Sequence, residues 1–298
     1  MTTGNTTVNG YVQLGHGPRK VLVLSGWFGS SADWAALSTS LDPDSFTYVF
    51  FDYRGYGRSL DLTGEFTFDE VARDVLALAD HLDWQRFSLI GHSMGGMAMQ
   101  RVLLAAPERI EKMAGVSPVP ACGSRMDEIR LRGFAGAIDD VDKRAAIINF
   151  STGNRLSARW SAHLASESVR LSRPEAFAAY LPQWATRDFS SEIAGNPAPV
   201  RLFIGEHDPT ITADLMDRTW LTWYPHATLE TLKNAQKRGT LCDVRSTGGV
   251  GYRAGKLAKT GVKSRAPPSD VSVCLQHDKP PFIMSALIAV CRARPSLT

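Results

Sequence analysis

The residues best suited to chemistry are a serine and the small residues around it. The run Gly91-His92-Ser93-Met94-Gly95-Gly96 has the form G-x-S-x-G and stands between a segment expected to be a strand and one expected to be a helix. A serine on such a turn is held in a strained backbone geometry that projects its hydroxyl above the sheet. The following helix N-terminus favours developing negative charge. The pattern predicts that Ser93 is a nucleophile.

Three other loops follow expected strands. Ser25-Gly26-Trp27-Phe28-Gly29 is rich in glycine, and Gly205-Glu206-His207-Asp208-Pro209 carries an acid. An acid at the carboxyl end of a late parallel strand can orient an imidazole, and Asp208 is well placed to do so. The third loop, from Asp52 to Ser59, is interpreted as a structural turn.

The elements that position these loops alternate between strand and helix through the first 235 residues. Apolar or β-branched runs predict strands at 20–25, 46–51, 86–90, 110–116, 200–204 and 227–232, and helical periodicity predicts helices at 68–84, 94–106 and 212–224. This alternation indicates an α/β fold with parallel strands and crossover helices. Residues 121–190 break the rhythm with several short helices, which predicts a helical lid inserted over the sheet.

The motifs, taken in this order, resemble the α/β-hydrolase fold family over about residues 8–235. The resemblance implies a mostly parallel, twisted sheet with helices on both faces. The core of that fold would comprise residues 1–120 and 191–235, with 121–190 as the lid.

The resemblance also assigns roles to individual residues. Ser93 would be the nucleophile and Asp208 the acid of a catalytic triad. The backbone N–H groups of Trp27 and Met94 would form the oxyanion hole, where each donor is worth roughly 3–4 kcal/mol of transition-state stabilisation. The family's loop often begins His-Gly, and here it begins Ser25-Gly26, which leaves the backbone donor in place.

The chain departs from the family after its last expected strand. The family places its catalytic histidine there, in a Gly-His loop before a closing helix, but this sequence has Gln236-Lys237-Arg238 and no amphipathic helix. Residues 236–298 hold 11 Lys+Arg and 3 acids, whereas residues 1–235 hold 22 and 27. This break indicates that a frame shift, splice or fusion event has replaced the C-terminus. We expect a basic tail that packs poorly against the core.

The other histidines are weak candidates for the missing base. The seven are His16, His81, His92, His163, His207, His226 and His277. His226 precedes the last expected strand, about six residues and therefore about 20 Å from the carboxyl end where sites form. His92 and His207 flank the nucleophile and the acid, and His163 belongs to the lid. Nothing in the sequence specifies that His277 returns to the site.

Three functions remain open at this point. The first is hydrolysis of a small or medium carboxylic ester through an acyl-enzyme on Ser93. The second is a catalytically impaired protein of this fold that keeps the pocket without its base. The third is a cofactor-free oxygenase or haloperoxidase on the same scaffold. Some lid aromatics would line an acyl pocket: Phe134, Phe150, Trp160, Phe177, Tyr180 and Trp184.

Composition excludes several other classes. With 44% hydrophobic and 21% charged residues the chain can fold around a core. Four cysteines without zinc-ligand spacing indicate free thiols and no metal site. The basic tail lacks the interleaved aromatics of a nucleic-acid binder. The sequence has no leader-like start and no run long enough to span a membrane, so we expect a soluble, cytoplasmic protein with an ester substrate and no cofactor.

Overall fold

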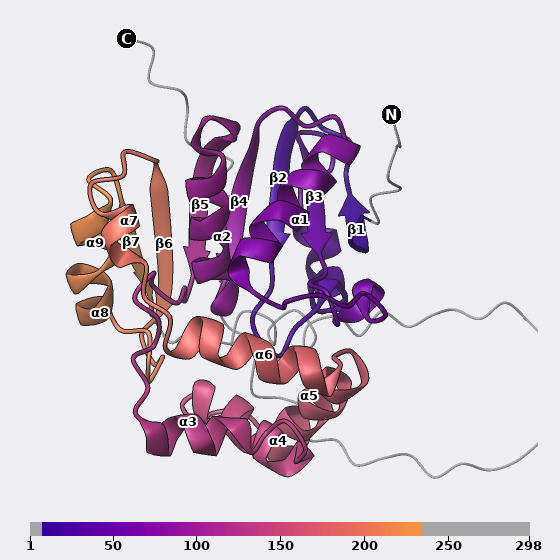
Figure 1. Cartoon of the computed structure of the whole chain (residues 1–298), viewed down its shortest axis with the longest axis vertical. Helices are drawn as coiled ribbons and strands as arrows, with labels where there is room; N and C mark the ends of the chain where they lie inside the picture. Colours follow the sequence, from indigo (N-terminus) through magenta and orange to yellow (C-terminus); the bar gives the residue numbers. More distant parts are fainter. Residues whose placement is uncertain (1–7, 234–298) are drawn as a thin grey trace, which may run out of the picture.

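The computed structural model of the chain describes residues 8–233. The predictions made for residues 236–298, His277 among them, lie outside this range. Within it, seven strands form one sheet in the order β1-β3-β2-β4-β5-β6-β7 (Figure 1). The α/β-hydrolase architecture expected from the motifs is confirmed, with one antiparallel strand at an edge of an otherwise parallel sheet.

The strands match the expected segments closely. The parallel members are β2 (Arg19–Leu24), β3 (Phe46–Phe51), β4 (Phe87–His92), β5 (Ile110–Val116), β6 (Val200–Gly205) and β7 (Thr228–Leu232). Every residue of β3 and β4 is buried, because both faces of the central sheet are covered. The antiparallel strand β1 (Tyr11–Leu14) was not predicted, since it is short and only partly buried and therefore has no apolar run.

Two helices that flank the sheet end where local backbone conformations stop them. Helix α1 (Phe68–His81) buries Val71, Val75 and Leu78. It ends before the predicted Trp84 because Asp83 adopts a φ of 56°, and the Trp84 N–H donates to the Ala79 carbonyl. Helix α2 (Met94–Ala105) ends before Pro107, as expected.

The helix predicted over 212–224 is two short helices in the structure. These are α8 (Ala213–Arg218) and α9 (Trp220–Trp223), with Thr219 between them at φ −127° and ψ −93°. The Thr219 hydroxyl donates to the Leu215 carbonyl, a bond of the kind that often bends a helix. Elsewhere in residues 8–233 the chain forms three 3₁₀ segments: η1 (Ser31–Ser40), η2 (Gly57–Ser59) and η3 (Pro107–Arg109).

The segment between β5 and β6 forms a helical layer at one end of the sheet (Figure 1). It comprises α3 (Glu128–Ala135), α4 (Val141–Ser151), α5 (Ala158–Arg170) and α6 (Pro174–Ala185), and the single turn α7 (Ser190–Ile193) follows it beside the sheet (Figure 1). The ring of Trp27, just after β2, stacks on Phe177 of α6 with centroids 3.9 Å apart. The layer therefore covers the carboxyl ends of the strands, where sites of open α/β sheets form.

A buried arginine joins several helices of this helical layer, the lid, to one another. Arg144 of α4 lies 3.6 Å above the centroid of Phe177, whose ring also stacks on Trp27. Its guanidinium donates to the hydroxyls of Ser168 and Ser172, both at 3.1 Å, and to two lid carbonyls. Phe177 and the sheet residue Leu24 belong to one hydrophobic cluster, so the lid and the sheet share a core.

The turn after β3 is structural, as interpreted from the sequence. Asp52 is buried and accepts hydrogen bonds from the Ser31 N–H and hydroxyl and from the Arg58 N–H. Desolvation raises the pKa of this carboxyl despite those bonds. Asp52 thus links the segment that begins at Ser31 to the turn that follows β3.

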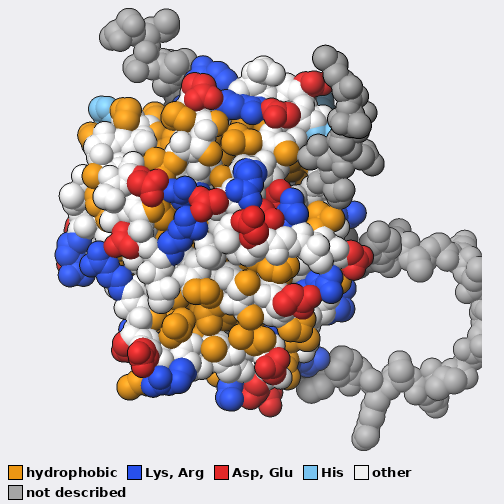
Figure 2. Space-filling view, viewed as in Figure 1, with side chains coloured by type: hydrophobic (Ala, Val, Ile, Leu, Met, Phe, Trp, Pro, Cys, Tyr) orange, Lys and Arg blue, Asp and Glu red, His pale blue; other side chains and the backbone are white. Residues whose placement is uncertain are grey.

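The face of the molecule shown in Figure 2 is mixed in charge. On this face, basic and acidic side chains are interspersed among apolar ones rather than gathered by sign. Among the helices described between residues 8 and 233, none has the length and apolar character needed to cross a bilayer.

Candidate active site

Ser93 occupies the turn between β4 and α2, with φ 54° and ψ −118°. Non-glycine residues rarely adopt such a conformation, which costs on the order of 1–3 kcal/mol and persists only where surrounding bonds hold it. Here the Ser93 N–H donates to the Val116 carbonyl at 3.1 Å. Its own carbonyl accepts from the N–H groups of Gly96 and Val119, both at 2.9 Å. The turn therefore has the strained geometry predicted from the motif.

Two glycines of the motif are required by close backbone approach. A Cβ atom on Gly95 would lie 2.3 Å from the Leu24 carbonyl oxygen. A Cβ atom on Gly91 would lie 2.4 Å from the carbonyl oxygen of Gly95 itself. Both separations are shorter than van der Waals contact permits, so the turn can pass against β2 only with glycine at these positions.

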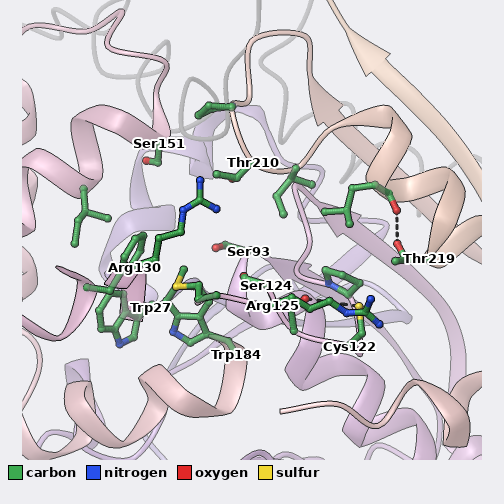
Figure 3. Close-up of a pocket in the computed structure, with 18 of the residues that line it drawn as sticks. Trp27, Ser93, Cys122, Ser124, Arg125, Arg130, Ser151, Trp184, Thr210 and Thr219 are labelled. Atoms are coloured by element: carbon green, nitrogen blue, oxygen red, sulfur yellow. Dashed lines mark hydrogen bonds between the residues drawn. The ribbon is translucent and has the colours of Figure 1, made fainter. Parts of the chain in front are cut away.

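The Ser93 side chain opens into a cavity of about 490 Å³ beneath the lid (Figure 3). This volume is typical of pockets for small organic ligands. The walls come from the loop after β2, from α3 and α4, from the end of α6, and from the segment around α8 and α9. Most of the wall is apolar, and includes Trp27, Phe28, Phe134, Ile147, Phe150 and Trp184.

The six lid aromatics divide into three groups, of which the first is Trp160 alone, a partly buried residue that does not line the cavity. Phe134, Phe150 and Trp184 line the cavity, as the sequence suggested for some of them. Phe177 and Tyr180 are buried in the shared core instead. A helix buries one face, and only the structure shows which face meets the cavity.

The loop after β2 lies directly against the serine. A Cβ atom on Gly26 would lie 3.1 Å from Ser93 Cβ. Trp27 is fixed by two hydrogen bonds, from its indole N–H to the Phe177 carbonyl at 2.8 Å and from the Tyr56 hydroxyl to its own carbonyl at 3.0 Å. Among the residues that the structure describes, no protein group accepts the backbone N–H of Trp27 or of Met94.

Asp208 follows β6 and is 5% exposed. Its Oδ1 accepts the N–H and hydroxyl of Thr210 and the N–H of Ile211, at 2.9–3.0 Å. The other oxygen, Oδ2, is buried and has no hydrogen-bond partner within residues 8–233. A buried carboxylate oxygen left unpaired is costly, so this atom requires a donor.

The six histidines within the described range do not provide that donor. His226 is exposed and precedes β7, as expected. His92 is buried beside Gly26, where a Cβ atom would lie 3.1 Å from its Nδ1. His207, although next in sequence to the acid, does not bond to its free oxygen. The position that would hold a Gly-His loop, residues 236–238, lies beyond the described part of the chain.

Three arginines line the cavity and were not identified from the sequence: Arg125, Arg130 and Arg218. Arg125 pairs with Asp188 at 3.7 Å, and Arg218 pairs with Asp214 one helical turn away. A usable signal existed for Arg130, because it stands four residues before Phe134 and therefore on the same face of α3.

Cys122 is a second potential nucleophile in the wall of the cavity. It is a free cysteine, 3% exposed, and burial raises the pKa of its thiol. A thiol with a raised pKa stays protonated near neutral pH and is a poor nucleophile. Among the described residues, no cluster of three His, Cys, Asp or Glu side chains could hold a metal ion.

Comparisons with known proteins agree with this geometry. Residues 20–235 match the family model of the alpha/beta hydrolase fold, and the chain belongs to that family. It is 25% identical to 3-oxoadipate enol-lactonase 2 of Acinetobacter baylyi over 240 residues, which cover 78% of this chain and 87% of the relative. It is 29% identical to the pimeloyl-[acyl-carrier protein] methyl ester esterase of Pectobacterium carotovorum, with 70% of this chain and 84% of the relative covered.

Solved structures show the same fold. An esterase from Exiguobacterium antarcticum superposes with a TM-score of 0.70 at 17% identity, covering 80% of this chain and 91% of that one. The relatives of this chain thus include esterases and other hydrolases of the α/β-hydrolase fold.

Proposed function

We propose that this protein hydrolyses a small or medium carboxylic ester or lactone through an acyl-enzyme on Ser93. The observation that carries the proposal is the strained turn that holds the Ser93 hydroxyl at the base of an apolar cavity. Similarity to an enol-lactonase and a methyl ester esterase supports the substrate class.

In the proposed reaction, Ser93 Oγ attacks the acyl carbon while its proton passes to a base. The negative charge on the carbonyl oxygen is stabilised by the N–H groups of Trp27 and Met94. The base then protonates the departing alcohol, which leaves an acyl ester on Ser93. Water attacks that ester, gives one proton to the base and releases the carboxylic acid, and Ser93 recovers its hydrogen.

The proposal gives Asp208 the task of orienting the base through Oδ2. That oxygen is suited to accept an imidazole N–H, because it is buried next to an Oδ1 that is already saturated by three donors. His277 is the one histidine of the sequence outside residues 8–233. It is therefore the candidate whose removal is informative.

A second candidate function is supported by the sequence after β7. Lys237 stands where the family has its histidine, and an unperturbed lysine with a pKa of about 10.4 is protonated at neutral pH. A chain without a base would bind esters and turn them over only slowly. Loss of a triad histidine costs roughly 10⁶-fold in kcat in a serine protease.

Turnover of p-nitrophenyl butyrate by the full chain separates these functions. We expect Ser93→Ala to abolish turnover and Asp208→Asn to lower it strongly, with both variants folded by circular dichroism. Undiminished turnover by Ser93→Ala would exclude the serine. Loss of turnover in His277→Ala would identify His277 as the base. Near-background turnover in the wild type that His277→Ala leaves unchanged would instead support the second function, a protein of this fold without its base.

A further inference from the structure

Arg130 differs from the other two arginines of the cavity in having no ion pair among the described residues. Figure 3 shows its side chain reaching from α3 into the cavity, toward the region where the Ser93 hydroxyl lies, whereas Arg125 extends toward Cys122. Arg130 is an exposed residue, and its side chain thus reaches into a space whose wall is mostly apolar.

The acids nearest to Arg130 in sequence are engaged elsewhere. The Asp127 carboxylate accepts the backbone N–H of Arg130 at 2.8 Å as the cap of α3. Glu128 pairs with Arg132 at 3.2 Å. No aspartate or glutamate lies among the residues that line the cavity. The positive charge of Arg130 is therefore not neutralised by the part of the wall that the structure describes.

The position of Arg130 on its helix also argues against a purely structural role. It stands in the first turn of α3, where the helix macrodipole is positive and disfavours a cation. A glutamate or an uncharged residue would stabilise the helix better at this position. A long side chain at this position does, however, extend from α3 into the cavity (Figure 3).

We propose that Arg130 binds a carboxylate of the substrate, so that this pocket selects short acyl chains carrying a terminal negative charge over neutral chains of the same shape. This inference rests on the proposed function for the bond that is cleaved. The carboxylate subsite at Arg130 affects substrate binding and takes no part in the cleavage of the ester bond. A guanidinium presents paired donors that fit a carboxylate, and a charge-assisted bond of this kind is strong even when partly solvated.

Binding is measured first, in the full chain carrying Ser93→Ala, so that hydrolysis plays no part. The two probes are the monoanilide of succinic acid and its primary amide, which match in shape and differ in charge. Titration by calorimetry should show the acid binding about tenfold more tightly than the amide, a ratio that corresponds to one exposed charge-assisted bond.

The variant Arg130→Gln should abolish this preference by weakening the acid about tenfold and leaving the amide within twofold. Arg130→Lys should retain part of it, because the charge remains without the paired donors. Arg132→Gln is the matched control, since this exposed arginine of the same helix pairs with Glu128 and does not line the cavity, and it should leave the preference intact. Equal affinities for acid and amide in the Ser93→Ala chain, or equal weakening of both by Arg130→Gln, would overturn the proposal.

Turnover provides the second readout in a chain with Ser93. The mono-p-nitrophenyl ester of succinic acid should be preferred over p-nitrophenyl butyrate in kcat/KM, and Arg130→Gln should remove that preference. A chain that binds the acid selectively and cleaves neither ester would refute the proposed hydrolysis while supporting the subsite. A chain that cleaves both esters with the same kcat/KM would refute the subsite while supporting hydrolysis.

Discussion

The carboxylate of Asp208 needs one further hydrogen-bond donor from the rest of the site. Its Oδ1 has three donors and its buried Oδ2 has none among the described residues, so a single additional N–H completes the carboxylate. In a triad that N–H belongs to the histidine, whose orientation and charge the acid stabilises. A test of the site can therefore be made by restoring an imidazole at the family's position.

The double substitution Gln236→Gly with Lys237→His rebuilds the Gly-His pair. If the wild type lacks a base, we expect hydrolysis of p-nitrophenyl butyrate to rise by several orders of magnitude, up to the roughly 10⁶-fold contribution of a triad histidine. The same change in an Asp208→Asn background should give a much smaller gain, because the new imidazole would lack its acceptor. A gain that is equally large without the carboxylate would argue against Asp208 as the triad acid.

Residues that could be predicted from sequence are those whose motif is local. Ser93 could be singled out because its neighbours in the chain, Gly91 and Gly95, are also its neighbours in space. Arg144 could not, since its environment is built by segments far apart in the sequence, whereas for Arg130 the sequence signal is its spacing from Phe134 on α3. Asp208 was found from its place after a strand, but its unpaired oxygen is visible only in the structure.

At the scale of elements, an ionic cluster ties the helices on one face to the end of the lid. Asp69 of α1 pairs with Arg101 of α2 and with Arg187, which follows α6, and Arg101 also pairs with Glu192 at 2.9 Å. Burial opposes ionisation of Asp69, but the hydrogen bonds from Arg187 and Arg101 outweigh it and hold the pKa of this carboxyl below its usual value.

This cluster predicts a pH-dependent contribution to stability. A depressed carboxyl pKa stabilises the fold above the unfolded pKa of about 3.9, and that contribution is lost as the pH falls through the lower folded value. Asp69→Asn should therefore lower the free energy of unfolding by about 1 kcal/mol or less at pH 7, a modest effect because the pair is partly solvated.

Urea unfolding of wild type and Asp69→Asn, compared between pH 7 and pH 3, measures this contribution. The difference between them should shrink toward the acidic end and in 1 M salt (about 3 Å screening length). Asp214→Asn, which removes an exposed pair within α8, is the control and should have a smaller effect. A difference that grows on acidification would contradict the assignment.

Which elements could be predicted depended on how fully they are buried. Strand β3 was predicted with the bounds that the structure shows, because a continuous run of apolar and β-branched residues marks a strand covered on both faces. The half-exposed β1 has no such run. The break between α8 and α9 comes from a hydroxyl bonded to the Leu215 carbonyl, which periodicity does not reveal.

At the scale of the whole molecule, the lid and the sheet are one packing unit. Arg144 stacks on Phe177, Phe177 stacks on Trp27, and Trp27 belongs to the loop that touches Ser93. Replacing Arg144 by Met would leave the hydroxyls of Ser168 and Ser172 without their donor. We expect a loss of about 2–4 kcal/mol of stability from these lost hydrogen bonds and the lost cation–π contact.

Because the core is shared, this loss should appear in the sheet as well as in the lid. Far-UV circular dichroism and tryptophan fluorescence should report the same urea midpoint in Arg144→Met, shifted equally from the wild type. Ile129→Ala, at a side chain 75% exposed on the lid, is the control and should leave the midpoint unchanged. Separate midpoints for the two probes would show that the lid unfolds on its own.

The lid is inserted between β5 and β6, which are hydrogen-bonded neighbours in the sheet, and this placement affects how the protein can evolve. Parallel neighbours need a crossover of some length in any case, and the sheet does not fix how long it is. The proposed nucleophile, Ser93, thus belongs to one stretch of the gene and the proposed carboxylate-binding arginine, Arg130, to another. Recombination that exchanges only the segment between β5 and β6 would therefore change which substrate a descendant protein binds and leave its catalytic reaction unchanged.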